Sequence, residues 1–171
     1  MSIRIWHQSF TVLSDLGAYD DALRAHFRKV ARPGTEIHLH GMLPGTYRNH
    51  YPGDDIKYSA LQYLHGLQFM AAGINAQHQG FDAYAISTLP EPALKETRSL
   101  LDIPVVGYGE SAMLTACMLG RTTHGINEVD GVPVLDSLGA WVKQAEAMVD
   151  LRRARSSRSP ASCRGNRVKS T

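Results

Sequence analysis

The sequence predicts an α/β protein built around a parallel sheet with helices on both of its faces. Short apolar runs rich in branched residues alternate with longer segments whose apolar residues recur at helical spacing. Gly and Pro separate these runs from one another. Apolar residues make up 43% of the chain and charged residues 20%, which is typical of a folded, water-soluble protein.

The first predicted elements are a strand, a helix and a second strand. Residues 3–6 form a short branched run that indicates a strand. Residues 15–31 form a helix that Pro33 and Gly34 end. Its apolar residues recur every three or four positions: Leu16, Tyr19, Leu23, Phe27 and Val30. Residues 35–40 alternate Ile37 and Leu39 with polar neighbours, as a strand does.

The next elements continue the alternation of strands and helices. A loop rich in Gly and Pro covers residues 41–53, and Asp54 or Asp55 can cap a helix expected over 56–79. Strands follow at 81–87 and 103–106, and helices at 92–101 and 109–119. This order predicts a parallel, Rossmann-like sheet. Because ligands of such sheets bind at the carboxyl ends of the strands, we expect the site at residues 6–10, 41–54, 87–91 and 107–110.

The second half of the chain is shorter than the first. Residues 121–131 are polar, and a strand at 132–135 then precedes a helix at 136–153. The branched-proline-branched pattern of 103–106 returns at 132–135, also before a helix, which favours an internal duplication. We therefore predict one full lobe over 1–120 and a remnant of a second, similar lobe over 121–153.

The C-terminal segment differs in charge from the rest of the chain. Residues 151–171 hold seven of the eighteen Lys and Arg and no Asp or Glu, so residues 1–150 carry −5. We predict a disordered basic tail over 154–171 and interpret it as a solvated charge run, with no nucleic-acid partner. Two cysteines cannot form a disulfide framework, and no apolar run approaches the length of a membrane span. We therefore expect a cytoplasmic protein without a membrane partner.

Three stretches of the chain resemble one known family. They are 81–94, 102–113 and 129–147, and the most specific part is Gly107-Tyr108-Gly109-Glu110-Ser111-Ala112-Met113. The chain is similar over residues 1–153 to the aspartate/glutamate/hydantoin racemase superfamily. The resemblance implies two α/β lobes with the active site between them, and a cysteine from each lobe. One thiolate removes an α-proton and the other thiol delivers one to the opposite face, without a cofactor.

The sequence departs from that family pattern in two places. Aligned on Glu91 and Pro92, the first catalytic cysteine falls at Thr88, whose hydroxyl is a much weaker base than a thiolate. The family places the second-lobe sheet and its cysteine between Leu119-Gly120-Arg121 and His124-Gly125-Ile126-Asn127, stretches that only Thr122 and Thr123 join here. We infer an internal deletion that leaves a shortened member of the family.

The candidate site residues lie at the expected strand ends. Thr88 takes the catalytic position by alignment, although the residue type favours a strand-end hydroxyl that bonds local backbone. A small carboxylate or hydantoin substrate would contact Gln8, Ser9, Ser87, Leu89 and Glu110. Glu110 can also be a first-turn acid that the helix dipole favours.

Other chemistry has weaker support. His38 and His40 lie two apart in a strand and would point the same way, yet no carboxylate or cysteine stands at a familiar ligand spacing, so we expect no metal. Gly107 and Gly109 lack the third glycine of a dinucleotide-binding loop. Cys117 lies in an apolar helical stretch and is expected to pack in the core.

Three functional hypotheses remain. The first is a cofactor-independent racemase that transfers a proton at the α-carbon of a small amino acid or hydantoin, impaired in this form. The second is a non-catalytic module that binds a small carboxylate. The third is a metal-dependent lyase or hydrolase that uses His38 and His40. An incomplete lobe would expose apolar surface, so we also expect self-association into a homo-oligomer.

Overall fold

The fold is a parallel sheet between two helical layers. The computed structural model describes residues 2–48, 52–119, 128–129, 132–133 and 135–157. Four strands form the sheet in the order β2-β1-β3-β4, with every neighbouring pair parallel. They are β1 (Ile3–Ser9), β2 (Thr35–His40), β3 (Ala83–Ser87) and β4 (Val105–Gly107). The predicted α/β class with a parallel sheet flanked by helices is confirmed.

The helices follow the strands in the predicted order, with two differences at their ends. They are η1 (Leu13–Asp15), α1 (Gly17–Val30), α2 (Gly53–Ile56), α3 (Ser59–His78), α4 (Leu94–Leu100), α5 (Tyr108–Leu119) and α6 (Ser137–Ser157). The helix predicted over 56–79 begins at Ser59, because the backbone of Tyr58 is extended, and the short helix α2 precedes it within the segment predicted as a loop. A short 3-10 turn precedes α1.

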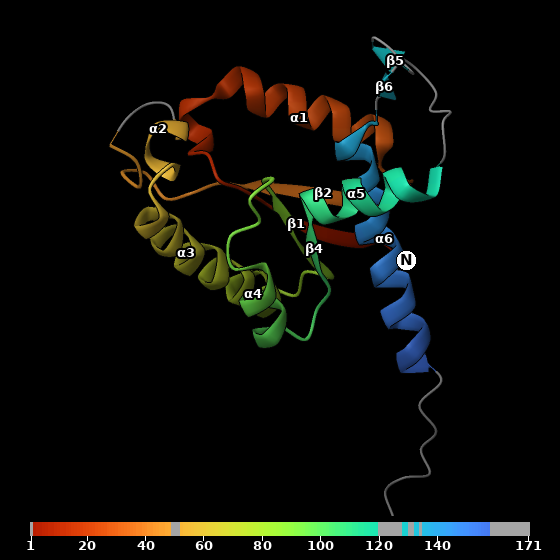
Figure 1. Cartoon of the computed structure of the whole chain (residues 1–171). Helices are drawn as coiled ribbons and strands as arrows, with labels where there is room; N and C mark the ends of the chain where they lie inside the picture. The colour runs from red at the N-terminus through yellow and green to blue at the C-terminus, as the bar shows by residue number, and fades with distance from the viewer. Residues whose placement is uncertain (1, 49–51, 120–127, 130–131, 134, 158–171) are drawn as a thin grey trace, which may run out of the picture.

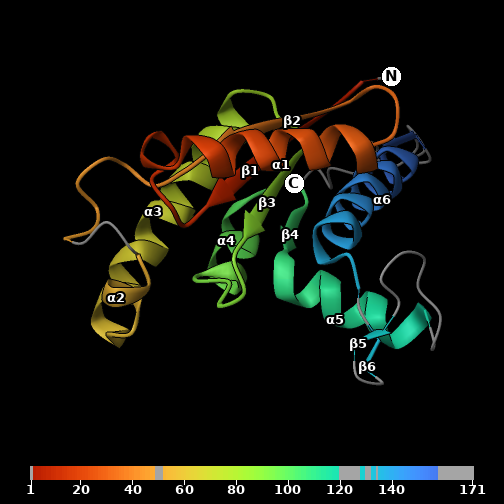
Figure 2. The same ribbon diagram turned by 90° about the horizontal axis from the view of Figure 1, so that it is seen from above.

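Helices lie on both sides of the sheet (Figures 1 and 2), and each face has its own core. On one face, Leu23 and Phe27 of α1 pack with Trp141 and Val142 of α6 against β1 and β3. On the other face, α3 contributes Phe69 and Ala76, and the Tyr84 hydroxyl donates to the carbonyl of Phe69 at 2.8 Å. All of β3, and all of β1 except Arg4, is buried, as expected of the central strands of a sheet covered on both faces.

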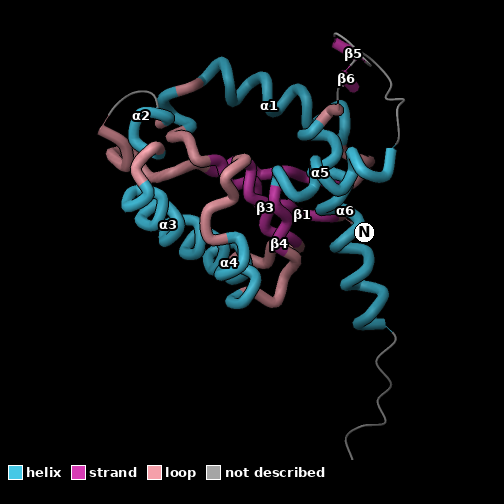
Figure 3. The backbone as a smooth tube through the Cα atoms, viewed as in Figure 1, coloured by secondary structure: helices cyan, strands magenta, loops and turns pink. Residues whose placement is uncertain are grey.

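Helix α6 belongs to the same core as the first four strands. Its buried residues Trp141, Val142, Ala145 and Val149 share one apolar cluster with β1, β3 and α1. The helix continues to Ser157, four residues into the segment predicted as a tail, and residues 158–171 lie outside the described part. In Figure 3, α6 runs past the edge of the sheet as one long helix.

The strand predicted over 132–135 does not extend the parallel sheet. Strand β6 (Val132–Pro133) pairs with β5 (Glu128–Val129) in a separate antiparallel sheet of two strands. Residues 120–127, where the sequence predicts the junction of a deletion, lie outside the described part. In the part of the chain that the structure describes, none of the helices is long and apolar enough to cross a membrane.

Candidate functional site

The carboxyl ends of β1 and β3 bring four of the predicted site residues together. Ser9 lies opposite Ser87 in the parallel register, and Gln8 lies opposite Ile86. Thr88 directly follows β3. The side chains of Gln8, Ser9, Ser87 and Thr88 are all buried, whereas Leu89 is 71% exposed. The site is therefore a buried polar floor at the strand ends, with Leu89 at its outer rim.

Gln8 and Ser9 use their polar groups to fix the end of β1. The Gln8 side chain accepts a hydrogen bond from Trp6 Nε1 at 3.0 Å, and its amide nitrogen donates to the carbonyl of Ser9 at 3.1 Å. The Ser9 hydroxyl accepts from the backbone N–H of Thr11 at 3.1 Å and lies 2.7 Å from the Thr11 hydroxyl. These contacts make Gln8 and Ser9 positioning residues of the strand end.

Thr88 lines a small cavity between the end of β3 and helix α3. The cavity has a volume of about 30 Å³, and its lining includes Phe10, His65, Phe69 and Pro90. Within the described residues, the hydroxyls of Ser87 and Thr88 form no side-chain hydrogen bond, and neither oxygen is among the fully buried polar atoms that lack a partner. These two hydroxyls at the end of β3 are therefore not used by the fold.

His65 of α3 is a further candidate that the sequence analysis missed. It is 5% exposed and shares the cavity lining with Thr88. Its ring packs edge-on against Tyr47, with centroids 4.9 Å apart, and the Tyr47 hydroxyl donates to the carbonyl of Phe10. Burial lowers the pKa of His65, while the negative charge of Asp55 opposes this change. The imidazole is therefore neutral at pH 7, which is its basic form.

Asp55 connects this group to the loop before α3. Its carboxylate is 2% exposed, accepts a hydrogen bond from the Arg48 backbone N–H at 2.8 Å, and lies 3.5 Å from Arg48 Nε. Burial and the charge of Asp55 both raise the pKa of Tyr47. The sequence indicated Asp55 only as a helix cap. The sequence held one signal for a role of Asp55 and His65 in the site: both lie near the start of a predicted helix that follows the loop expected at the site.

The position of the Glu91 carboxylate accounts for the glycine at position 107, in the Gly107-Tyr108-Gly109 stretch at the end of β4. Its carboxylate accepts the Glu110 backbone N–H at 2.9 Å, in the first turn of α5. A Cβ on Gly107 would lie 2.3 Å from Glu91 Oε1, so only glycine leaves room for this carboxylate. Glu91 itself has a left-handed backbone with φ of 46°. A side chain of the protein thus occupies the anion position at this helix start, where the sequence indicated a bound ligand.

The carboxylate of Glu110 is paired with a cation of the same chain. It forms a two-point ion pair with the guanidinium of Arg98, one contact being 3.2 Å, and this pair lowers the pKa of Glu110. Arg98 also donates from Nε to the carbonyl of Val105 at 3.0 Å. The structure therefore places Glu110 in a contact between α4, β4 and α5 rather than beside Thr88.

His38, His40 and Cys117 occupy positions that do not form a site together. The His40 ring stacks on Trp6 at 3.4 Å and its Nδ1 donates to the His38 carbonyl, while His38 Nε2 lies 3.5 Å from Glu36. No group of three metal-ligating side chains occurs among the described residues. Cys117 is exposed, so the expectation that it packs in the core was wrong: apolar neighbours in sequence did not place it on the inner face of α5.

Comparison with solved structures adds evidence on the fold. No protein-family model and no curated protein sequence matches the chain. Among solved structures, the chain is similar to allantoin racemase from Klebsiella pneumoniae, with a TM-score of 0.54 and 25% sequence identity. The match covers 71% of this chain and 45% of that protein, so the chain spans less than half of the length of its structural neighbour. This likeness supports the superfamily that the sequence motifs indicated, and we conclude that the chain has a racemase-type α/β fold.

Proposed function

We propose that this chain is a shortened, racemase-like protein that binds a small carboxylate or hydantoin and exchanges its α-proton, with impaired inversion. The observation that carries the proposal is the position of Thr88. It lies at the carboxyl end of a central strand in a racemase-type fold, and it lines the same cavity as His65. The name of the structural neighbour adds allantoin to the substrates to be tested.

The chemistry of inversion explains why we propose an impaired activity. Racemisation passes through a planar carbanion, so one group removes the proton and another delivers a proton to the opposite face. The neutral imidazole of His65 can accept a proton, and Thr88 can orient the substrate by a hydrogen bond. Both groups line the same cavity, whose volume of about 30 Å³ is smaller than these substrates, so binding requires the cavity to widen. A proton returned from this one side regenerates the starting stereoisomer.

The test is to compare proton exchange with inversion. Aspartate, glutamate, 5-substituted hydantoins and allantoin are incubated with the full chain in D2O, and deuterium at the α-carbon and optical purity are followed in parallel. We expect deuterium incorporation that exceeds inversion by at least about tenfold, since a single proton-handling side favours retention. Inversion as fast as exchange would contradict the shortened, one-sided site.

Two variants assign the exchange to named groups. His65→Gln removes the base and Thr88→Val removes the hydroxyl while keeping a branched side chain of similar shape. His78→Gln, in the last turn of the same helix, changes an exposed histidine and serves as the control. We expect loss of exchange for His65→Gln and unchanged exchange for His78→Gln. Equal exchange in both variants would exclude His65 as the base.

The second candidate function is a binding module without chemistry. The residue at the first cysteine position favours it, because a threonine hydroxyl is a poor base at neutral pH. Saturable binding of a small carboxylate without deuterium exchange would support this module. Neither binding nor exchange for any of the four compound classes would refute both functions. Activity that a chelator abolishes would instead support a metal-dependent enzyme that uses His38 and His40.

A further inference from the structure

The two edges of the parallel sheet differ in how they are closed. Strand β4 is three residues long, and the Val105 carbonyl accepts a hydrogen bond from Arg98. Strand β2 is six residues long, and within the described part it pairs with β1 alone. A long strand with unpaired backbone groups on one side is a template for pairing with another chain. The β2 edge is therefore the candidate surface for association.

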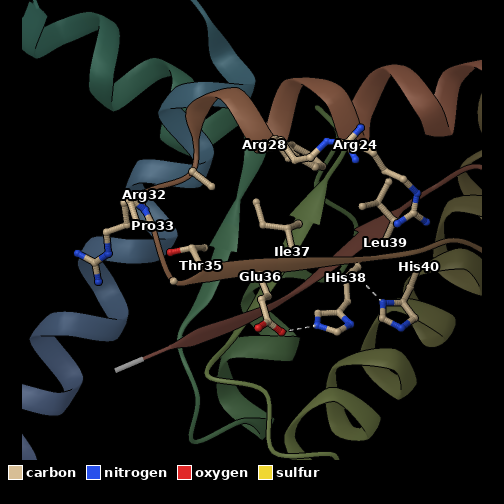
Figure 4. A pocket seen from close by; sticks show the side chains of 13 residues that line it. Arg24, Arg28, Arg32, Pro33, Thr35, Glu36, Ile37, His38, Leu39 and His40 are labelled. Carbon is tan, nitrogen blue, oxygen red and sulfur yellow. Dashed lines mark hydrogen bonds and ion pairs between the residues drawn. The ribbon is translucent and has the colours of Figure 1, made fainter.

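A groove runs along this edge beneath helix α1 (Figure 4). It has a volume of about 720 Å³, and its lining comes from β2, the turn before it and the last two turns of α1. Arg24 and Arg28 of α1 and Arg32 of the turn after it lie among the lining residues. Arg24 pairs with Asp20 at 2.9 Å and Arg32 pairs with Asp150 at 2.6 Å, so two of these charges are balanced within the chain. The groove is open enough to receive an extended strand.

The register of the sheet tells which backbone groups of β2 point into this groove. The backbone N–H of Ile3 donates to the Gly34 carbonyl, and Ile3 lies opposite Thr35 in the parallel register. In a parallel sheet, the backbone N–H and C=O groups of alternate residues point to opposite sides of the strand. Those of Glu36, His38 and His40 therefore bond to β1. Ile37 and Leu39 direct theirs outward, and their half-buried side chains lie on the α1 side.

The sequence of β2 is complementary to itself when read in the opposite direction. In an antiparallel pair centred on His38, Ile37 of one chain lies opposite Leu39 of the other, and both present outward backbone groups. Glu36 then lies opposite His40 on the other face, once at each end of the pair. The Glu36 carboxylate is 62% exposed and available for such a contact. No like-charged carboxylates face each other in this register.

We propose that two copies of this chain associate through antiparallel pairing of their β2 strands, which joins the two sheets into one of eight strands. The partner is a second copy because β2 supplies both members of each pair. These are the apolar pair of Ile37 with Leu39 and the pair of Glu36 with His40. This interface lies along β2 and does not involve Thr88, so it stands independently of the proposed activity. The dimer brings Glu36 of each copy next to His40 of the other.

The first test measures the oligomeric state by sedimentation velocity over a range of protein concentrations. We expect a dimer for the unmodified chain and a dissociation constant raised about tenfold or more by Glu36→Lys, which removes the contact between the Glu36 carboxylate and the His40 imidazole twice per dimer. Glu96→Lys makes the same charge change on exposed α4 and is expected to leave the dimer unchanged. A monomer at every concentration, or equal effects of the two variants, would overturn the proposal.

The second test measures the register by disulfide formation. In a chain without Cys117 and Cys163, His38→Cys puts two thiols opposite each other at the dimer axis, about 4.5 Å apart between Cα atoms, a distance that a disulfide spans. Glu36→Cys puts the two thiols about 14 Å apart, since four residues separate them along the strands. We expect mild oxidation to crosslink the first variant only. Equal crosslinking of both, or of Glu36→Cys alone, would refute this register.

Discussion

His7 makes the stability of this protein sensitive to pH. It lies in the centre of β1 between the rings of Phe27 and Trp141 and is fully buried. Neither ring nitrogen has a hydrogen-bond partner among the described residues. Burial, aided by the nearby His40, lowers the pKa of His7 from 6.5 to about 3. The folded protein therefore holds this imidazole in its neutral form.

The size of the effect follows from the two pKa values. The unfolded chain takes up a proton at His7 below pH 6.5, whereas the folded chain does so only near pH 3. The unfolded state therefore binds more protons between these values, and the free energy of unfolding falls as the pH falls. At about 1.4 kcal/mol per pH unit, the loss is about 2 kcal/mol at pH 5 and about 4 to 5 kcal/mol below pH 3. Above pH 6.5 this contribution is constant.

The variant His7→Leu isolates this contribution. Leucine fills a similar volume without a titrating group or an unpaired polar atom, so we expect the free energy of unfolding at pH 7 to rise by about 1 to 3 kcal/mol. Between pH 7 and pH 5 the variant loses about 2 kcal/mol less than the unmodified chain. Urea denaturation at both pH values measures the two effects. The control His78→Leu removes an exposed histidine and keeps the original pH dependence.

One result would refute the reasoning about His7. If His7→Leu and the unmodified chain lost the same free energy of unfolding between pH 7 and pH 5, His7 would titrate alike in the folded and unfolded states. The ring would then be accessible to water or paired to an acceptor.

Three further substitutions test contacts in the core and at the start of α5, each by urea denaturation at pH 7. Gly107→Ala pushes a methyl group into the Glu91 carboxylate that caps α5, and should lower the free energy of unfolding by about 1 to 3 kcal/mol. The control is Gly17→Ala, because a Cβ at Gly17 meets no atom within 4 Å. It should change the free energy of unfolding by less than about 1 kcal/mol. Tyr84→Phe removes a buried hydrogen bond to α3 and should lower it by about 1 to 2 kcal/mol; no change would mean that the bond is absent in solution. Trp141→Ala should lower it by about 3 to 5 kcal/mol because α6 shares the core of the sheet, while Leu151→Ala on its exposed face should stay within about 0.5 kcal/mol. Equal effects of the last two would show that α6 does not pack on the sheet.

The sequence by itself determined the elements whose signals are local. The alternation of Ile37 and Leu39 with polar residues predicted β2 to its ends, and the spacing of Leu23 and Phe27 predicted the inner face of α1. The order of strands and helices predicted a parallel sheet, because parallel strands need helical crossovers. The motifs at the ends of β3 and β4 indicated a racemase-type protein, and the structural likeness supports that superfamily.

Only the tertiary structure decided how distant residues use their polar groups. Glu91 caps α5 over Gly107, and Glu110 turns to Arg98, so neither role follows from the motif that contains these residues. Cys117 lies outside the core although its sequence neighbours are apolar. The break at Tyr58 between α2 and α3 was also invisible to apolar periodicity, which continues across it.

The same division applies to the site. Sequence placed Thr88 at a strand end by local pattern, whereas His65 lines the same cavity only because α3 packs on the sheet. Tyr47 and Asp55 act on His65 through ring packing and charge. Helix α6 joins the core of residues more than a hundred positions earlier. Local sequence fixes backbone preferences within a few residues, but burial and charge at a side chain depend on what packs against it, and that is decided when the whole chain folds.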